Sequence, residues 1–119
     1  IKPLSLQKRD VEVQKVITVN SKKISLSVWD NERVDGDRIS LSLNGKWILR
    51  NYEIIKEKHS LDIELIKNQV NELVFFAENL GEIPPNTTAI NIKYEGYNKT
   101  HIMRSNMDKS ASINFYIEE

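Results

Sequence analysis

Apolar and polar residues alternate along most of this chain with the two-residue period of β-strands. Turn signals rich in Asn, Gly, Asp or Pro separate the alternating segments, and no stretch sustains a helical period. This spacing predicts about eight strands in an all-β fold, a single antiparallel β-sandwich of the Ig-like or jelly-roll type. The clearest segments run over residues 11–19, 24–29, 39–43, 61–65, 73–77, 89–94, 101–104 and 111–117.

One of these segments, Leu73-Val74-Phe75-Phe76-Ala77, is apolar at odd and even positions alike, so that both faces of the strand are apolar. Strands that are covered on both faces show such continuous apolar runs, so we expect a central strand here. Glu72 and Glu78 flank the run, and charged flanks of this kind protect an aggregation-prone strand.

The hairpin signal Asn44-Gly45 leaves two registers open. A two-residue loop would leave Trp47 and Leu49 on the serine-bearing face of the hairpin. A three-residue loop, with Gly45 in a bulge, would place Trp47 opposite Leu41 instead. The second register groups the large apolar residues, and we therefore favour it.

Length and charge restrict the classes of function. The 119 residues predict one domain at 11–119, preceded by a leader or linker at 1–10. Lys and Arg together number 17, as do Asp and Glu, and this balance argues against a nucleic-acid partner. The chain has no cysteine and no apolar run long enough to span a membrane. Because it begins with Ile1, we expect a mature or trimmed fragment.

The densest chemistry lies in an acidic turn that carries Asp30, Asp35 and Asp37. Calcium prefers several oxygen ligands from a flexible loop, so the turn is a candidate calcium site, although its spacing does not match an EF-hand. Alternatively, the aspartates accept backbone N–H bonds, and Asp35 or Asp37 pins the proline loop at residues 84–87. We expect the two loops to pack together, and alanine at position 35 or 37 to cost about 1–3 kcal/mol.

Aromatic residues offer a second candidate site. Trp29 and Trp47 would suit stacking on a sugar face, whereas the structural alternative makes both of them fillers of the core or a sheet face. His59 and His101 lie in unrelated strands, and no nucleophile-elbow motif is present. The sequence therefore predicts a protein that is not an enzyme.

Three segments together suggest a relationship. They are Val28 to Lys46, with V-D-G-D and L-N-G-K, then A-E-N-L-G-E-I-P-P-N-T from Ala77 to Thr87, and the closing strand Ser110 to Ile117. In combination they resemble a family of small β-sandwich domains in secreted and envelope proteins of Gram-negative bacteria. The resemblance covers roughly residues 10 to 118 and implies a sandwich, an exported location and an accessory role. It carries over no catalytic residue.

We therefore expect a non-catalytic accessory or interaction module of an exported bacterial envelope protein. Its location would be periplasmic, cell-surface or extracellular. Its partners would be other modules of the parent chain or envelope proteins, with a glycan as a further option, and it would need no cofactor. The alternative is a carbohydrate-binding module, assisted by calcium, that uses the three aspartates with Trp29 or Trp47.

Overall fold

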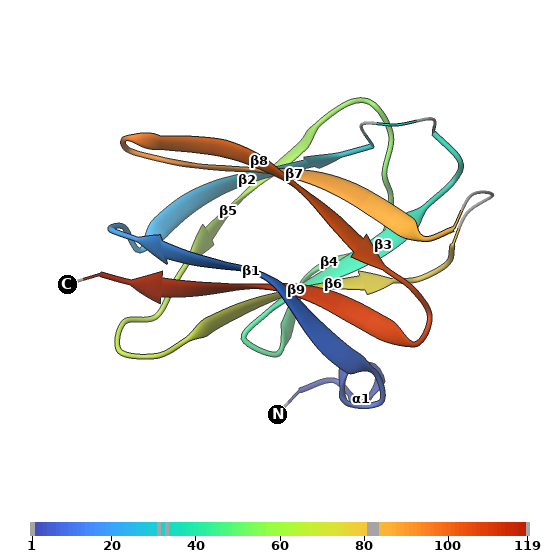
Figure 1. The fold of residues 1–119 in the computed structure, drawn as a ribbon, viewed down its shortest axis with the longest axis horizontal. Coiled ribbons are helices and arrows are strands. Elements are labelled where there is room, and N and C mark those ends of the chain that lie inside the picture. Colours follow the sequence, from blue (N-terminus) through green and yellow to red (C-terminus); the bar gives the residue numbers. More distant parts are fainter. Residues whose placement is uncertain (1, 31, 33, 81–83, 119) are drawn as a thin grey trace.

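The chain folds into two stacked β-sheets, as a computed structural model shows for residues 2–30, 32, 34–80 and 84–118 (Figure 1). The prediction of a β-sandwich is confirmed, with nine strands in the described residues. The elements are α1 (Leu4–Gln7), β1 (Asp10–Val19), β2 (Lys23–Trp29), β3 (Arg38–Leu43), β4 (Lys46–Glu53), β5 (His59–Glu64), β6 (Asn71–Ala77), β7 (Asn86–Tyr94), β8 (Tyr97–Ser105) and β9 (Lys109–Ile117).

Sheet A has the strand order β1-β9-β6-β3-β4, and sheet B has the order β5-β2-β7-β8. All neighbours are antiparallel except β1 and β9, which run parallel from the pair Asp10–Lys109 to the pair Val19–Ile117. The first and last strands of the domain are therefore hydrogen-bonded to each other. Strand periodicity cannot show which strands become neighbours, and this parallel pair was not predicted.

The core fills the space between the sheets because each strand sends every second side chain inward. Sheet A contributes the alternate apolar residues of β3, β6 and β9, and sheet B contributes those of β2 and β7. The largest side chains among them have at most 2% of their surface exposed: Ile24, Leu26, Ile39, Leu41, Leu73, Phe75, Ile90, Ile92 and Phe115.

The outer face of β6 has a small core of its own, which the N-terminal residues cover. Leu6 of α1 packs with Val74 and Phe76, and the edge of the Trp47 ring meets Phe76 at a centroid distance of 5.6 Å. The Arg9 guanidinium lies 3.7 Å from the Phe76 ring centroid. Residues 2–9, which we predicted to be a leader or linker, thus lie against sheet A. The prediction that β6 is covered on both faces is confirmed.

The hairpin between β3 and β4 has a two-residue loop, so the favoured three-residue register is wrong. Leu43 pairs with Lys46, and Asn44 and Gly45 have φ values of 52° and 84°. This type I′ geometry matches the twist of the strands. Trp47 pairs with Ser42 on the outer face, and a bulge then brings Leu49 opposite Leu41. The bulge, rather than the turn, therefore brings the apolar residues Leu41 and Leu49 opposite each other.

A side chain joins the open edges of the two sheets. The register of β1 shifts between Val13 and Lys15, which leaves Gln14 in a bulge. Its Nε2 donates to the carbonyl oxygen of Arg104 at 2.7 Å, and its Oε1 accepts from the Arg104 backbone N–H at 3.2 Å. The Gln14 amide thereby takes the place of a neighbouring strand at this point on the edge of β8.

Candidate functional site

The acidic turn connects the two sheets at one end of the sandwich. Asp30 directly follows β2 of sheet B, and Asp37 directly precedes β3 of sheet A. Both are held by the segment after β4, because the Asp30 N–H donates to Ile55 O at 2.8 Å and the Ile54 N–H donates to Asp37 O at 3.0 Å. Ile54 is fully buried, so the segment that fixes the turn is itself anchored in the core.

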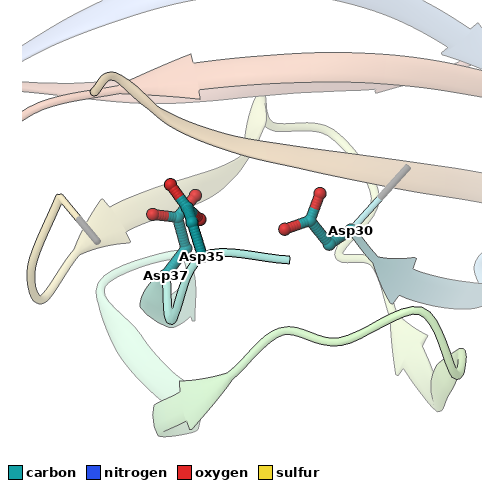
Figure 2. Close-up of side chains that lie close together, drawn as sticks. All are labelled: Asp30, Asp35 and Asp37. Atoms are coloured by element: carbon teal, nitrogen blue, oxygen red, sulfur yellow. The ribbon is translucent and has the colours of Figure 1, made fainter. Parts of the chain in front are cut away.

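The structure brings together all three aspartates that the sequence singled out (Figure 2). One carboxylate oxygen from each of Asp30, Asp35 and Asp37 lies within 4.8 Å of the other two. Asp35 and Asp37 lie side by side, and Asp30 faces them across the turn. Their exposed fractions are 3%, 9% and 2%, which makes this a largely buried acidic cluster rather than a solvated turn.

The oxygens of the cluster are not equally satisfied. Asp37 Oδ2 accepts the Thr87 N–H at 3.2 Å, and Asp30 Oδ1 accepts the Glu32 N–H at 3.0 Å. Asp37 Oδ1 is buried and has no hydrogen-bond partner among the described residues. The prediction that an aspartate pins the proline loop is thus confirmed for Asp37, with one of its two oxygens.

Burial raises the pKa of Asp37 to about 7 from an ordinary value of 3.8. The Thr87 N–H opposes this shift, whereas the charge of Asp35, the side-chain hydrogen bond that a protonated Asp37 would share with Asp35, and the charge of Asp30 reinforce it. The ionised cluster is therefore costly to bury, and a bound positive charge, either a proton or a metal ion, would relieve that cost.

Two asparagines hold the proline loop against the acidic turn. Asn79 Oδ1 accepts the Arg38 N–H at 2.8 Å, and Asn79 Nδ2 donates to Gly36 O at 3.1 Å. Asn86 Nδ2 donates to Arg38 O at 3.0 Å and to Asn79 O at 3.1 Å. The predicted packing of the two loops is therefore confirmed. The asparagines that carry it were not predicted, although both stand in the A-E-N-L-G-E-I-P-P-N-T segment, of which residues 81–83 lie outside the described residues.

A polar groove of about 460 Å³ opens beside the proline loop. We call this end of the sandwich, with the acidic turn, the proline loop and the β8–β9 turn, the loop end; it lies at the right of Figure 1. Only Pro85 among the lining residues is apolar. The sequence could not reveal the groove because its lining comes from β1, β8, β9 and two loops. The lining residues are Glu12, Gln14, Pro85, Arg104, Ser105, Asn106, Lys109 and Ser110.

The structure does not bring Trp29 and Trp47 together. Trp29 alternates with the buried residues of β2 and is half-buried on the outer face of sheet B, where Lys58 Nζ lies 4.6 Å from its ring centroid. Trp47 is half-buried on the outer face of sheet A, with the Arg50 guanidinium 4.5 Å from its centroid. Two rings on opposite faces cannot form one flat platform for a sugar.

Comparison with known proteins does not add to this picture. No family model matches the chain, and no curated protein or solved structure matches it either. Among the described residues, no helix has the length and apolar character required to cross a membrane.

Proposed function

We propose that this chain is a non-catalytic accessory module of an exported bacterial envelope protein, and that it binds its partner at the loop end. Its location is then periplasmic, cell-surface or extracellular. The polar groove is the observation that carries this proposal. The resemblance of the acidic turn and the proline loop to segments of secreted and envelope β-sandwich domains supports the location.

The groove suits binding because its surroundings are already fixed. The Gln14 side chain bonds both backbone groups of Arg104. Asn86, which follows Pro85, donates its side-chain amide to the carbonyl oxygen of Arg38. A site whose residues are ordered before binding loses less conformational entropy when the partner arrives. Binding residues are also commonly found on loops that a rigid scaffold positions.

The chemistry of the groove favours a polar partner with both donors and acceptors. Arg104 and Lys109 offer positive charge, Glu12 offers negative charge, and Asn106 offers an amide. A polar segment of an envelope protein, or of another module of the parent chain, matches such a mixed lining. A glycan is the second option, although Trp29 and Trp47 lie too far apart to stack on one sugar together.

The test compares two double variants that remove the same charge at opposite ends of the molecule. Arg104→Ala/Lys109→Ala changes the groove, and Lys22→Ala/Lys67→Ala changes the far end of the sandwich. The purified chain is applied to arrays of envelope-protein peptides and of glycans. We expect binding to a peptide that the groove variant weakens at least about tenfold and the far-end variant preserves. Equal binding by both variants would place the partner elsewhere.

Two further observations would contradict the proposal. Fractionation of the source cells should find the protein outside the cytoplasm, and a purely cytoplasmic signal would exclude an exported role. The isolated chain should not turn over a bound ligand. Turnover that is lost on substitution of a single carboxylate or histidine would identify an enzyme instead.

A further inference from the structure

We propose that Asp30, Asp35 and Asp37 bind a calcium ion, which links sheet B to sheet A at the loop end. This inference concerns a site next to the polar groove and does not depend on the function proposed for the groove. Its basis is the unpartnered oxygen of Asp37 within a buried set of three convergent carboxylates.

The unpartnered oxygen is the observation that points to a ligand. Four buried side-chain atoms in the described part of the chain have no hydrogen-bond partner, and three of them belong to Ser42, His101 and Ser110. The fourth, Asp37 Oδ1, is the only carboxylate oxygen among them. Buried charged groups are normally paired or coordinate a metal, because the desolvation of an unpaired charge is costly. A cation at this oxygen would supply the missing partner.

The spacing of the carboxylates fits a calcium shell. Calcium lies about 2.3–2.6 Å from its oxygen ligands, so two ligands of one ion are at most about 5 Å apart. The three oxygens here lie within 4.8 Å of one another, inside that limit. Magnesium binds at about 2.1 Å and requires a near-ideal octahedron, so the corresponding limit is about 4.2 Å. A set of oxygens drawn from a loop suits the more flexible calcium geometry.

The positions of the ligands determine what the ion would do. Asp30 directly follows a strand of sheet B, whereas Asp35 and Asp37 lead into a strand of sheet A. Asp37 also holds Thr87 at the start of β7, which is again in sheet B. An ion shared by the three carboxylates therefore fastens the crossover between the sheets and, through Thr87, the proline loop. The role is structural, and no reaction at the ion is implied.

The expected affinity suits an exported protein. Calcium sites of extracellular modules have dissociation constants of about 0.1–1 mM, because calcium is abundant outside cells. Three carboxylates drawn from one loop, without the bidentate glutamate of an EF-hand, belong in this weaker class. Asp35 is the most exposed of the three ligands, so the ion would enter on its side.

The experiment is calorimetric titration of the full chain, stripped with EDTA, with calcium chloride and separately with magnesium chloride. We expect one calcium site with a Kd of about 0.1–1 mM and magnesium binding at least about tenfold weaker. Saturating calcium should raise the melting temperature by several degrees, because only the folded chain holds the site.

Isosteric variants assign the ion to these residues. Asp37→Asn and Asp30→Asn should each weaken calcium binding at least about tenfold, because each removes a charged ligand but keeps an oxygen for the Thr87 or Glu32 N–H. Asp62→Asn is the matched control. Asp62 is exposed on β5, accepts a bond from Ser25, and should bind calcium like the wild type.

Hydrogen exchange tests the link between the sheets. Calcium should slow exchange of the Thr87 amide and leave the amides at the opposite end of β7, next to the turn between Tyr94 and Tyr97, unchanged. No heat and no melting shift at about 10 mM calcium would overturn the proposal, as would equal affinity for magnesium or an equal loss in Asp62→Asn. The groove variant Arg104→Ala/Lys109→Ala should retain calcium, so failure at the groove and failure at the ion site can be told apart.

Discussion

Two buried polar clusters lie toward opposite ends of sheet A, and their polar atoms find hydrogen-bond partners in different ways. Asn71 is fully buried, and its Oδ1 accepts from the Ile66 N–H and from Asn44 Nδ2 at 2.8 and 2.9 Å. Its Nδ2 donates to Ile66 O and Gln69 O. The amide thus uses both its donors and its acceptors. The aspartate cluster has only acceptors when ionised, and Asp37 Oδ1 remains without a partner in the described residues.

The contrast shows that a neutral amide can use both its donors and its acceptors within the chain, whereas ionised carboxylates that converge are acceptors only and repel one another. Asn71 connects the β5–β6 turn to the β3–β4 hairpin with no external component. Asp30, Asp35 and Asp37 also connect the two sheets, and a proton or a metal ion at the cluster would offset the repulsion between their charges. The reciprocal exchange of amide and carboxylate at these positions tests this view directly.

The largest effect should follow from Asn71→Asp. The new carboxylate would face the carbonyl oxygens of Ile66 and Gln69, to which the amide now donates. Two buried bonds would become repulsive contacts, and the free energy of unfolding should fall by about 3–4 kcal/mol at neutral pH. Urea unfolding measures the change, with the exposed Asn98→Asp as control. A loss below about 1 kcal/mol would mean that this amide is not essential.

A smaller loss should follow from Asp37→Ala. The variant leaves the Thr87 N–H without its acceptor and removes one of the bonds that hold the proline loop to the acidic turn. We expect the free energy of unfolding to fall by about 1–3 kcal/mol in the presence of calcium. Thermal unfolding of the variant beside the wild type measures it, and an unchanged melting temperature would contradict the pinning role of Asp37.

The effect of Asp37→Asn on the free energy of unfolding should change sign when calcium is added. In EDTA at pH 8 the substitution removes a charge that is costly to bury and keeps an acceptor for Thr87, so the variant should be more stable by about 1 kcal/mol. In saturating calcium the wild type should be the more stable protein, because it alone holds the ion tightly. The same order in both buffers would mean that no cation occupies the cluster.

The pH dependence of stability follows from the same carboxyl. The pKa of Asp37 is about 7 in the folded chain and about 3.8 when exposed, so the folded state binds more protons between these values. In EDTA this contribution to stability is fully present below about pH 4 and is lost as the pH rises through 7. Denaturant unfolding from pH 5 to 8 should show this decline in the wild type. The decline should be reduced in Asp37→Asn, and identical profiles would assign it to other groups.

The sequence predicted the elements better than their connections. Alternation revealed the sandwich, and the run 73–77 revealed its central strand, because both patterns report directly on burial. The hairpin at Asn44-Gly45 was placed in the wrong register because a bulge beyond the turn leaves no mark in the alternation. Helix α1 was missed because four residues held by the side chain of Leu6 show no period.

The candidate site was also predicted only in part, because the sequence shows neighbouring residues but not the distant ones that contact them. Asp30, Asp35 and Asp37 could be named because they belong to one turn. Which carboxylate oxygen would lack a partner depends on Thr87, fifty residues away, and only the fold places it there. The bonds made by Asn71, Asn79 and Asn86 were not predicted, since the sequence does not show that their amides are half-buried or buried.

The pairing of β1 with β9 also sets an order of events during synthesis. Sheet A cannot be completed until residue 117 has emerged, because its first strand hydrogen-bonds to its last. Until then β6 lacks one of its two neighbouring strands, and its apolar run has an unpaired edge. Glu72 and Glu78 are the charged residues that flank this run and disfavour aggregation. Folds that depend on such distant contacts form slowly. The nascent chain therefore keeps sheet A incomplete, with β6 short of a neighbour, until nearly all of the chain has been synthesised.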